Sequence, residues 1–169
     1  MTKSELKEFL DEKVILYNNP KFIESDPIQI PHSFTLKEDI EIAGFLSATI
    51  AWGNRKMIIN NAKQLMEIMG NSPYDFIVNH KENDLEKLSG FVHRTFNSID
   101  AVYFIKSLQN IYQNHNGLES VFAKHQEATS LQNSISEAKK VFFELEHPQR
   151  TTKHFSDPMN GSAAKRINI

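Results

Sequence analysis

The chain has 169 residues, of which 40% are hydrophobic and 24% charged, and this composition is typical of a globular protein rather than a disordered one. It contains no cysteine, which excludes disulfide bonds, thiolate zinc sites and cysteine nucleophiles. The net charge of −2 is unevenly distributed: residues 1–146 carry 15 basic and 20 acidic side chains, and residues 147–169 carry four basic and one acidic. We therefore divide the chain into a helical domain, 1–146, and a basic loop with the start of a helix, 147–169.

The N-terminal residues run directly into an amphipathic pattern and lack the apolar stretch of a secretory signal. The longest nearly apolar stretch, Ile40 to Trp52, contains Glu41 and is too short to cross a bilayer. We expect a cytoplasmic protein that does not contact a membrane.

Helical spacing begins at the N-terminus, where Thr2 and Glu5 have the spacing of a capping box. Apolar residues follow at helical intervals until the sequence Asn18-Asn19-Pro20, where we expect the first helix to end. Three prolines predict an extended segment over residues 20–34, because proline fixes φ and restricts the residue before it. The apolar residues are Leu6, Phe9, Leu10, Val14 and Tyr17, and the prolines are Pro20, Pro27 and Pro31.

A second capping box, formed by Thr35 and Glu38, predicts the start of the most apolar helix. One of its faces is largely apolar and another carries small residues, which is typical of a buried helix that its neighbours approach closely. We expect it to be the central helix of the core. The first face consists of Ile42, Phe45, Leu46, Thr49 and Ile50, and the small face of Ala43, Gly44 and Ser47.

Trp52-Gly53-Asn54 interrupts the helical pattern, with Gly53 as the C-cap of one helix and Asn54 as the N-cap of the next. The second of these helices should run to about Met69 and end at Gly70. A proline after Ser72 predicts a short helix that follows, and the charged residues 80–87 predict a surface turn leading into another short helix.

The clearest helical pattern lies in the middle of the chain and should end at Asn116-Gly117. A further helix is expected over residues 131–145. No segment shows the sustained alternation of a half-buried strand, so we predict an all-α fold, an orthogonal bundle of several helices. The residues of the clearest pattern are Ala101, Phe104, Ile105, Leu108, Ile111 and Tyr112.

The C-terminal segment changes to a loop at His147. Ser162 is then a candidate N-cap for a helix that starts at Ala163 and is incomplete at Ile169. A helix of about seven residues is marginal by itself, because helix nucleation is costly. The sequence therefore predicts a helix that is cut short.

Most enzyme motifs are absent from the sequence. It contains no glycine-rich phosphate loop, no Gly-x-Ser-x-Gly and no His-Glu-x-x-His. The seven histidines are dispersed singly, and none has ligand spacing on one helix. We expect no metal site and no cofactor.

Two pairs of cations are expected in the first turn of a helix. Arg55 and Lys56 follow Asn54, and Lys165 and Arg166 follow Ser162. The helix dipole disfavours cations there by a few tenths of a kcal/mol each. A bound phosphate would reverse the sign, because free N–H groups, dipole and side chains would all point at one anion. The alternative is that these long side chains bend away into water.

A third candidate is Phe91-Val92-His93-Arg94-Thr95-Phe96, which lies between two predicted helices. Its aromatic rings could stack on bases, with Arg94 near a phosphate. The more frequent outcome for such a pattern is that Phe91 and Phe96 anchor the loop to the core. These three places give a candidate DNA-binding set of Asn54, Arg55, Lys56, His93, Arg94, Ser162 and Arg166.

At these residues the sequence resembles an uncharacterised bacterial protein family, which is itself distantly similar to the helix-hairpin-helix DNA glycosylase superfamily. The matching stretches cover nearly the whole chain. They are Asp26-Pro27, Ile30-Pro31-His32, residues 38–56 (EDIEIAGFLSATIAWGNRK), Ser72 to Phe76, residues 91–96 (FVHRTF), Ser156-Asp157-Pro158 and residues 162–168 (SAAKRIN).

The resemblance implies an all-helical fold with a DNA-binding groove between two lobes. It implies that Lys165 is the nucleophile that lysine-type glycosylases use: a neutral amine attacks the sugar C1′ and expels a damaged base through a Schiff base. The base must first leave the stack, which favours a lesion or a mismatch. A helix N-terminus and the neighbouring Arg166 would favour the neutral amine.

The sequence departs from the glycosylase pattern in two respects. Family members continue into a further helical segment with an aspartate-containing motif, which this chain does not have. The glycine-rich hairpin before the lysine is also missing, since Gly161 is the only glycine there. We therefore expect at most a glycosylase- or lyase-like activity that requires the further segment. The alternative is a non-enzymatic helical domain that binds a protein partner.

Overall fold

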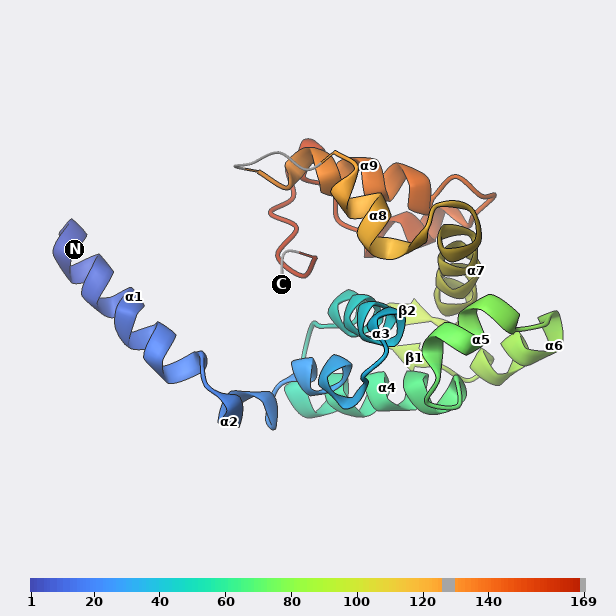
Figure 1. Ribbon diagram of the computed structural model, residues 1–169, viewed down its shortest axis with the longest axis horizontal. Helices are drawn as coiled ribbons and strands as arrows, with labels where there is room; N and C mark the ends of the chain where they lie inside the picture. The colour runs from blue at the N-terminus through green and yellow to red at the C-terminus, as the bar shows by residue number, and fades with distance from the viewer. Residues whose placement is uncertain (126–129, 168–169) are drawn as a thin grey trace.

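The computed structural model describes residues 1–125 and 130–167. The fold is mostly helical, as predicted, and α3 lies between α4 on one side and α8 and α9 on the other (Figure 1). The longer helices are α1 (Lys3–Tyr17), α3 (Lys37–Thr49), α4 (Arg55–Ile68), α7 (Ser98–Asn114) and α9 (Gln132–Phe142). The short helical segments are α2 (Pro20–Ile23), η1 (Pro27–Gln29), η2 (Pro31–Ser33), α5 (Pro73–Asn79), α6 (Glu82–Leu85), η3 (Glu86–Leu88), α8 (Gly117–Ala123), η4 (Gln149–His154) and η5 (Pro158–Asn160).

The first helix, α1, begins and ends where the sequence predicts. The Thr2 N–H donates to the Glu5 carboxylate at 2.7 Å, and the Glu5 N–H donates to Thr2 Oγ1 at 3.3 Å, which confirms the capping box. The helix projects away from the rest of the molecule (Figure 1). It is described over its whole length, and none of its residues is buried.

The segment of residues 20–34 is not extended, and this prediction was wrong. It forms α2, η1 and η2, each with a proline in its first position. The φ that proline fixes is compatible both with an extended segment and with the first turn of a helix, so a proline alone does not distinguish the two. The preceding polar residues decide between them, because Asn19 caps the Lys21 N–H at 3.0 Å and Asp26 caps the Ile28 N–H at 3.1 Å.

The central helix is α3, as predicted. Ile42 and Leu46 are buried, and Pro31 lies 3.8 Å from the position that a Cβ on Gly44 would take. The predicted capping box is wrong, since the helix begins after Leu36, which supplies no side-chain cap. Asp39, in the first turn of α3, accepts the Tyr74 N–H at 2.8 Å and so joins α3 to the start of α5.

Between α3 and α4 the chain makes a sharp turn over residues 50–54, which we call the α3–α4 turn. Gly53 adopts φ +108°, a conformation that favours glycine, although the C-cap of α3 is Ile50 rather than Gly53. Asn54 Oδ1 accepts the Met57 N–H at 3.2 Å, which confirms Asn54 as the N-cap of α4. The helix ends before Gly70, which has φ +67°.

The segment Phe91 to Phe96 forms a small hairpin, although the sequence predicted no strand. Strands β1 (Val92–His93) and β2 (Phe96–Asn97) pair antiparallel, with His93 opposite Phe96. Arg94, at φ +56°, makes the tight turn between them. Two-residue strands are too short to show alternation, so the pattern could not reveal them. Both phenylalanines are 1% exposed, which confirms that they anchor this segment to the core.

Helix α7 forms as predicted and is followed directly by α8, which the sequence analysis missed. Asn116 has φ +60° and turns the chain at the predicted end of α7. Helix α9 is shorter than predicted and ends at Phe142, whose carbonyl accepts the Tyr103 and Ser107 hydroxyls at 2.8 and 2.6 Å. These two hydrogen bonds attach α9 to α7.

The C-terminal segment packs against the core through Thr151, His154, Phe155 and Ala164, all of which are buried. The helix predicted after Ser162 does not form in residues 163–167, the described part of that stretch. The Ser162 hydroxyl accepts the Ala164 N–H at 3.2 Å, and Ala164 adopts φ +44°. A helix of so few residues does not repay its nucleation cost, and local turns take its place. Residues 168 and 169 lie outside the described part of the chain.

Candidate functional site

Three of the predicted site residues, from segments far apart in sequence, meet at the α3–α4 turn. His93 Nε2 lies 3.2 Å from the Trp52 carbonyl oxygen. The Arg94 side chain lies against Gly53, and Arg166 lies over the Trp52 ring, with its guanidinium carbon 4.8 Å from the ring centroid. Asn54 is the last residue of the turn, and together with Arg55 and Lys56, which follow it, it lines a shallow hollow. The α3–α4 turn is therefore the centre of the candidate site.

The position of Arg166 differs from the prediction. Its Nη1 donates to the Thr49 carbonyl at 2.7 Å, so the guanidinium caps the C-terminal end of α3. A cation is favoured at that end of a helix dipole, whereas the sequence placed it at an N-terminal end. Burial lowers the pKa of Arg166 below its usual value, and its contact with Trp52 offsets part of the lost hydration.

Arg55 and Lys56 stand in the first turn of α4, as predicted. The Arg55 guanidinium lies 3.8 Å from Asp26 and 5.7 Å from the centroid of the Phe22 ring. The Arg55 side chain is 56% exposed, so this ion pair contributes little. Lys56 is exposed. Both cations are thus close to the free N–H groups of α4 and accessible to an anion from solvent.

The position of Arg94 depends on Gly53. A Cβ on Gly53 would come within 3.1 Å of Arg94 Nη1, which is tighter than most Cβ contacts and would require the guanidinium to shift. Gly53 therefore provides both the positive φ of the turn and the space for the guanidinium. Lys165 precedes Arg166 in sequence and is exposed. We name Arg55, Lys56, Arg94, Lys165 and Arg166 the basic turn cluster.

His93 supports this cluster from below the surface. It is 0% exposed, and its Nδ1 lies 2.8 Å from Asn61 Nδ2. Since an amide nitrogen only donates, Nδ1 accepts and the Nε2–H donates to the Trp52 carbonyl. Burial lowers the pKa of His93 and favours this neutral form. The ring positions the turn and is not available to a ligand from solvent.

The sequence analysis missed a buried network that holds the C-terminal segment against Trp52. Asp100 is 0% exposed and accepts the Thr151 hydroxyl at 2.8 Å. Arg150 Nη2 lies 3.1 Å from Asp100 Oδ2, and His154 Nε2 lies 3.4 Å from it without the geometry of a hydrogen bond. The His154 ring stacks on Trp52 at a centroid distance of 5.8 Å. The partners are about fifty residues apart in sequence, and only the Asn97–Asp100 capping box was visible as a local signal.

A groove of about 910 Å³ begins at the α3–α4 turn and runs along α3. Its sides come from η1 and η2 on one side and from α8 and the C-terminal segment on the other, and Arg55 and Arg166 line it. Lys37 lies between Glu41 and Glu119 on the rim, and the Tyr112 hydroxyl donates to Glu41 at 2.8 Å. The groove is mainly apolar, with lining residues that include Ile28, Phe34, Ile40, Phe45, Ala48 and Leu118.

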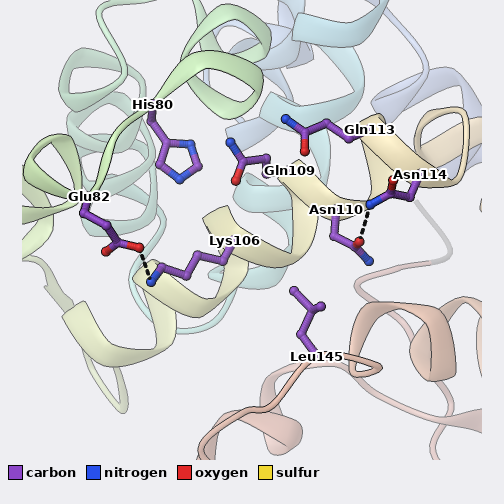
Figure 2. A pocket seen from close by; sticks show the side chains of 8 residues that line it. All are labelled: His80, Glu82, Lys106, Gln109, Asn110, Gln113, Asn114 and Leu145. Carbon is purple, nitrogen blue, oxygen red and sulfur yellow. Dashed lines mark hydrogen bonds and ion pairs between the residues drawn. The ribbon is translucent and has the colours of Figure 1, made fainter.

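A second hollow, of about 400 Å³, lies between α5, α6 and α7, away from the turn (Figure 2). Several of its polar side chains bind their neighbours. Lys106 pairs with Glu82 at 2.8 Å, and Asn114 donates to Asn110 at 2.7 Å (Figure 2). Gln109 donates to the Val78 carbonyl at 3.2 Å. These contacts account for the polar residues there as surface structure, so we place the functional site at the α3–α4 turn.

Within residues 1–125 and 130–167, no group of three or more His, Asp or Glu side chains is placed to hold a metal ion. Over the same residues, no helix combines the length and the apolar composition that crossing a bilayer requires.

Comparison of the chain with curated proteins and with solved structures gives no match. A family described as "Protein of unknown function (DUF2400)" matches residues 26–169, a range that includes the whole basic turn cluster and the groove but not α1. This match confirms that the chain resembles an uncharacterised family, and the further likeness to the glycosylases stays a prediction. The chain belongs to the DUF2400 family of proteins of unknown function.

Proposed function

We propose that this protein binds DNA through the basic turn cluster. The observation that carries the proposal is the gathering of cations from three segments around one turn, although the chain as a whole is slightly acidic. Phosphate contacts supply most of the non-specific affinity for DNA, and an arginine side chain can bind a phosphate through two parallel hydrogen bonds. The remaining acidic surface repels DNA, so binding is directed to this one face.

Two further features favour a phosphate ligand at this place. The first turn of α4 offers free N–H groups, and Asn54 satisfies only the one that belongs to Met57. Arg55 and Lys56 stand beside those groups in the least favourable part of the helix dipole. A phosphate in the shallow hollow next to Asn54 would turn this unfavourable arrangement into a favourable one.

The test is a salt titration of binding to fluorescently labelled duplex and single-stranded DNA, read by anisotropy. Each phosphate contact contributes a slope of about −0.9 in log affinity against log salt for duplex DNA. The double variant Arg55→Ala/Lys56→Ala should therefore weaken binding and make the slope shallower by about 1.8. We expect no measurable change in the thermal midpoint, because both side chains are largely exposed.

The matched control is Lys81→Ala/Lys87→Ala, which removes the same charge from exposed positions near α6, at the opposite end of α4. The control should keep the wild-type slope. Equal losses in the two double variants, or no binding of the wild type at low salt, would exclude a specific role of the basic turn cluster.

A glycosylase-like reaction extends this proposal to Lys165. Its side chain is exposed and adjacent to Arg166, which favours access to a bound strand. On abasic DNA, the neutral Nζ would add to the C1′ aldehyde and release water to form an imine. Borohydride then reduces the imine to a stable secondary amine. Because the expected activity requires the further segment, the test uses a chain that includes it. We expect an adduct with that chain and with its Lys56→Ala variant, but not with its Lys165→Ala variant. Without a Lys165-dependent adduct the nucleophile role is lost, whereas the salt titration still decides DNA binding.

A further inference from the structure

Helix α1 carries an apolar face that its own body does not cover. Leu6, Phe9, Leu10, Val14 and Tyr17 recur at helical spacing and are 41%, 48%, 51%, 57% and 53% exposed. This spacing is the pattern by which an amphipathic helix enters a groove. A helix of 15 residues is marginally stable in water, so α1 needs a surface that stabilises it.

The joint between α1 and α2 holds the helix away from the body of the same chain. Asn19 Nδ2 donates to the Leu16 carbonyl at 2.7 Å, while Asn19 Oδ1 accepts the Lys21 N–H. The rings of Tyr17 and Phe22 meet edge to face at a centroid distance of 5.6 Å. These contacts hold α1 in the projecting orientation that Figure 1 shows. The face is thus presented to another molecule.

The same chain carries a surface that suits such a helix. The groove along α3 is mainly apolar, has a volume of about 910 Å³ and is open to solvent. Ile40 lies in it and is 40% exposed, so part of its apolar lining faces water. The isolated chain thus leaves two apolar surfaces uncovered, the groove along α3 and the face of α1.

We propose that two copies of this protein form a symmetric dimer in which α1 of each copy lies in the groove of the other. A two-fold arrangement uses both surfaces of both chains and leaves no open end. Aromatic side chains bury roughly 150–250 Å² each. Phe9 and Tyr17 of the two copies would together bury roughly 600–1,000 Å². The aliphatic residues of the two faces and the residues of the two grooves add to this area, toward the ~1,600 Å² of a stable interface.

The charges of α1 agree with this arrangement. At 100° per residue, Lys3 and Lys13 lie within the arc of the apolar residues and Lys7 lies beside it, whereas the acidic residues of α1 lie on the opposite side. Lys13 Nζ is indeed 4.9 Å from the centroid of the Phe9 ring. These lysines would meet the groove rim at Glu119, whose side chain is 67% exposed and which shares Lys37 with Glu41.

Two other occupants of the face are less favourable. Fifteen residues give two heptads, which is fewer than a coiled coil between two α1 helices needs. The four acidic residues of α1 outnumber its three lysines, so an anionic lipid surface would gain little from binding it. Neither alternative covers the groove.

The first test is the oligomeric state of the intact chain, measured by light scattering over a range of concentrations. Leu10→Asp places a charge on the apolar face and should raise the dimer dissociation constant at least about tenfold. Ile15→Asp makes the same change on the opposite side of α1, where the side chain is 79% exposed, and should leave the dimer intact. Because no α1 residue is buried, neither variant disturbs the fold of the body.

The second test uses the absence of natural cysteine to identify the surfaces in contact. Equal amounts of Leu10→Cys and Ile40→Cys chains are mixed and oxidised. The mixture should give a disulfide-linked dimer in large excess over either variant alone, and a mixture of Ile15→Cys with Ile40→Cys should not. The chain with both Leu10→Cys and Ile40→Cys should link between copies rather than within one.

Several results would overturn the proposal. They are a wild type that stays monomeric up to high micromolar concentration, a dimer that Leu10→Asp leaves unchanged, a disulfide that forms within one chain, and binding of α1 to lipid vesicles without dimerisation.

Discussion

Single residues at the α3–α4 turn have roles that depend on their contacts more than on their chemical type. Arg55 and Arg166 were both expected to oppose a helix dipole. Arg55 does so in the first turn of α4, whereas Arg166 caps the C-terminal end of α3 and is stabilised by the dipole of that helix. His93 was expected among the DNA-binding residues; in the structure it is buried and donates to the Trp52 carbonyl. The site thus contains accessible cations, such as Arg55, and buried side chains that hold the turn in place, such as His93.

At this scale Gly53 is the residue whose replacement should have the clearest effect. The substitution Gly53→Ala would force alanine into a positive φ and would place its Cβ 3.1 Å from Arg94 Nη1. We expect a loss of about 1–3 kcal/mol in the free energy of unfolding, measured with urea. Gly90→Ala is the control, because the described residues leave open space around its Cβ and its φ is not positive. Equal stability of the two variants would contradict the role given to Gly53.

A pH-dependent stability follows from His154. Burial lowers the pKa of this histidine, although Asp100 acts in the opposite direction. The unfolded chain then takes up a proton near pH 6.5 that the folded chain resists, so stability is full above this pH and falls as the pH decreases below it. The slope should be at most about 1.4 kcal/mol per pH unit for each such histidine.

The measurement is urea unfolding between pH 7.5 and 5.5. His154→Gln should reduce the loss of stability over this range, and His147→Gln, which changes a half-buried histidine on the surface, should not. Part of the slope should remain in His154→Gln, because burial lowers the pKa of His93 as well. An unchanged slope in His154→Gln would show that another group is responsible.

At the scale of elements, local sequence predicted the helices with strong caps and clear periodicity and missed the segments that tertiary contacts decide. The Thr2–Glu5 and Asn54 caps are confirmed, as is α7 with its turn at Asn116. The start of α3 was misplaced, because the helix begins after Leu36, which supplies no side-chain cap. No local rule could place Arg166 against α3, since the contact joins residues that are 117 positions apart.

The candidate site was predictable in part for the same reason. The sequence identified the cations that follow a predicted N-cap, because the position of a residue relative to a helix cap is a local property. It did not identify Asp100, whose carboxylate binds Thr151 and Arg150 and so fixes the C-terminal segment. A buried carboxylate with several partners is visible only when the chain is folded, since each partner by itself is an ordinary surface residue type.

At the scale of the molecule, two surfaces have different characters and therefore different expected partners. The basic turn cluster is polar and suits a phosphate backbone. The groove and the apolar face of α1 suit each other. They meet at the α3–α4 turn, because Arg55 and Arg166 line the groove as well. A two-fold dimer would thus present two basic turn clusters, which gives a bound strand two points of attachment.

The chain has one tryptophan, and it lies at the point where these surfaces meet. Trp52 stands under Arg166, meets His93 edge to face at 5.1 Å and stacks on His154. Its indole emission therefore reports on this single location, without interference from a second indole. Trp52 is therefore an intrinsic fluorescent probe. Displacement of Arg166 by a ligand, or protonation of His154, would change its emission without any added label.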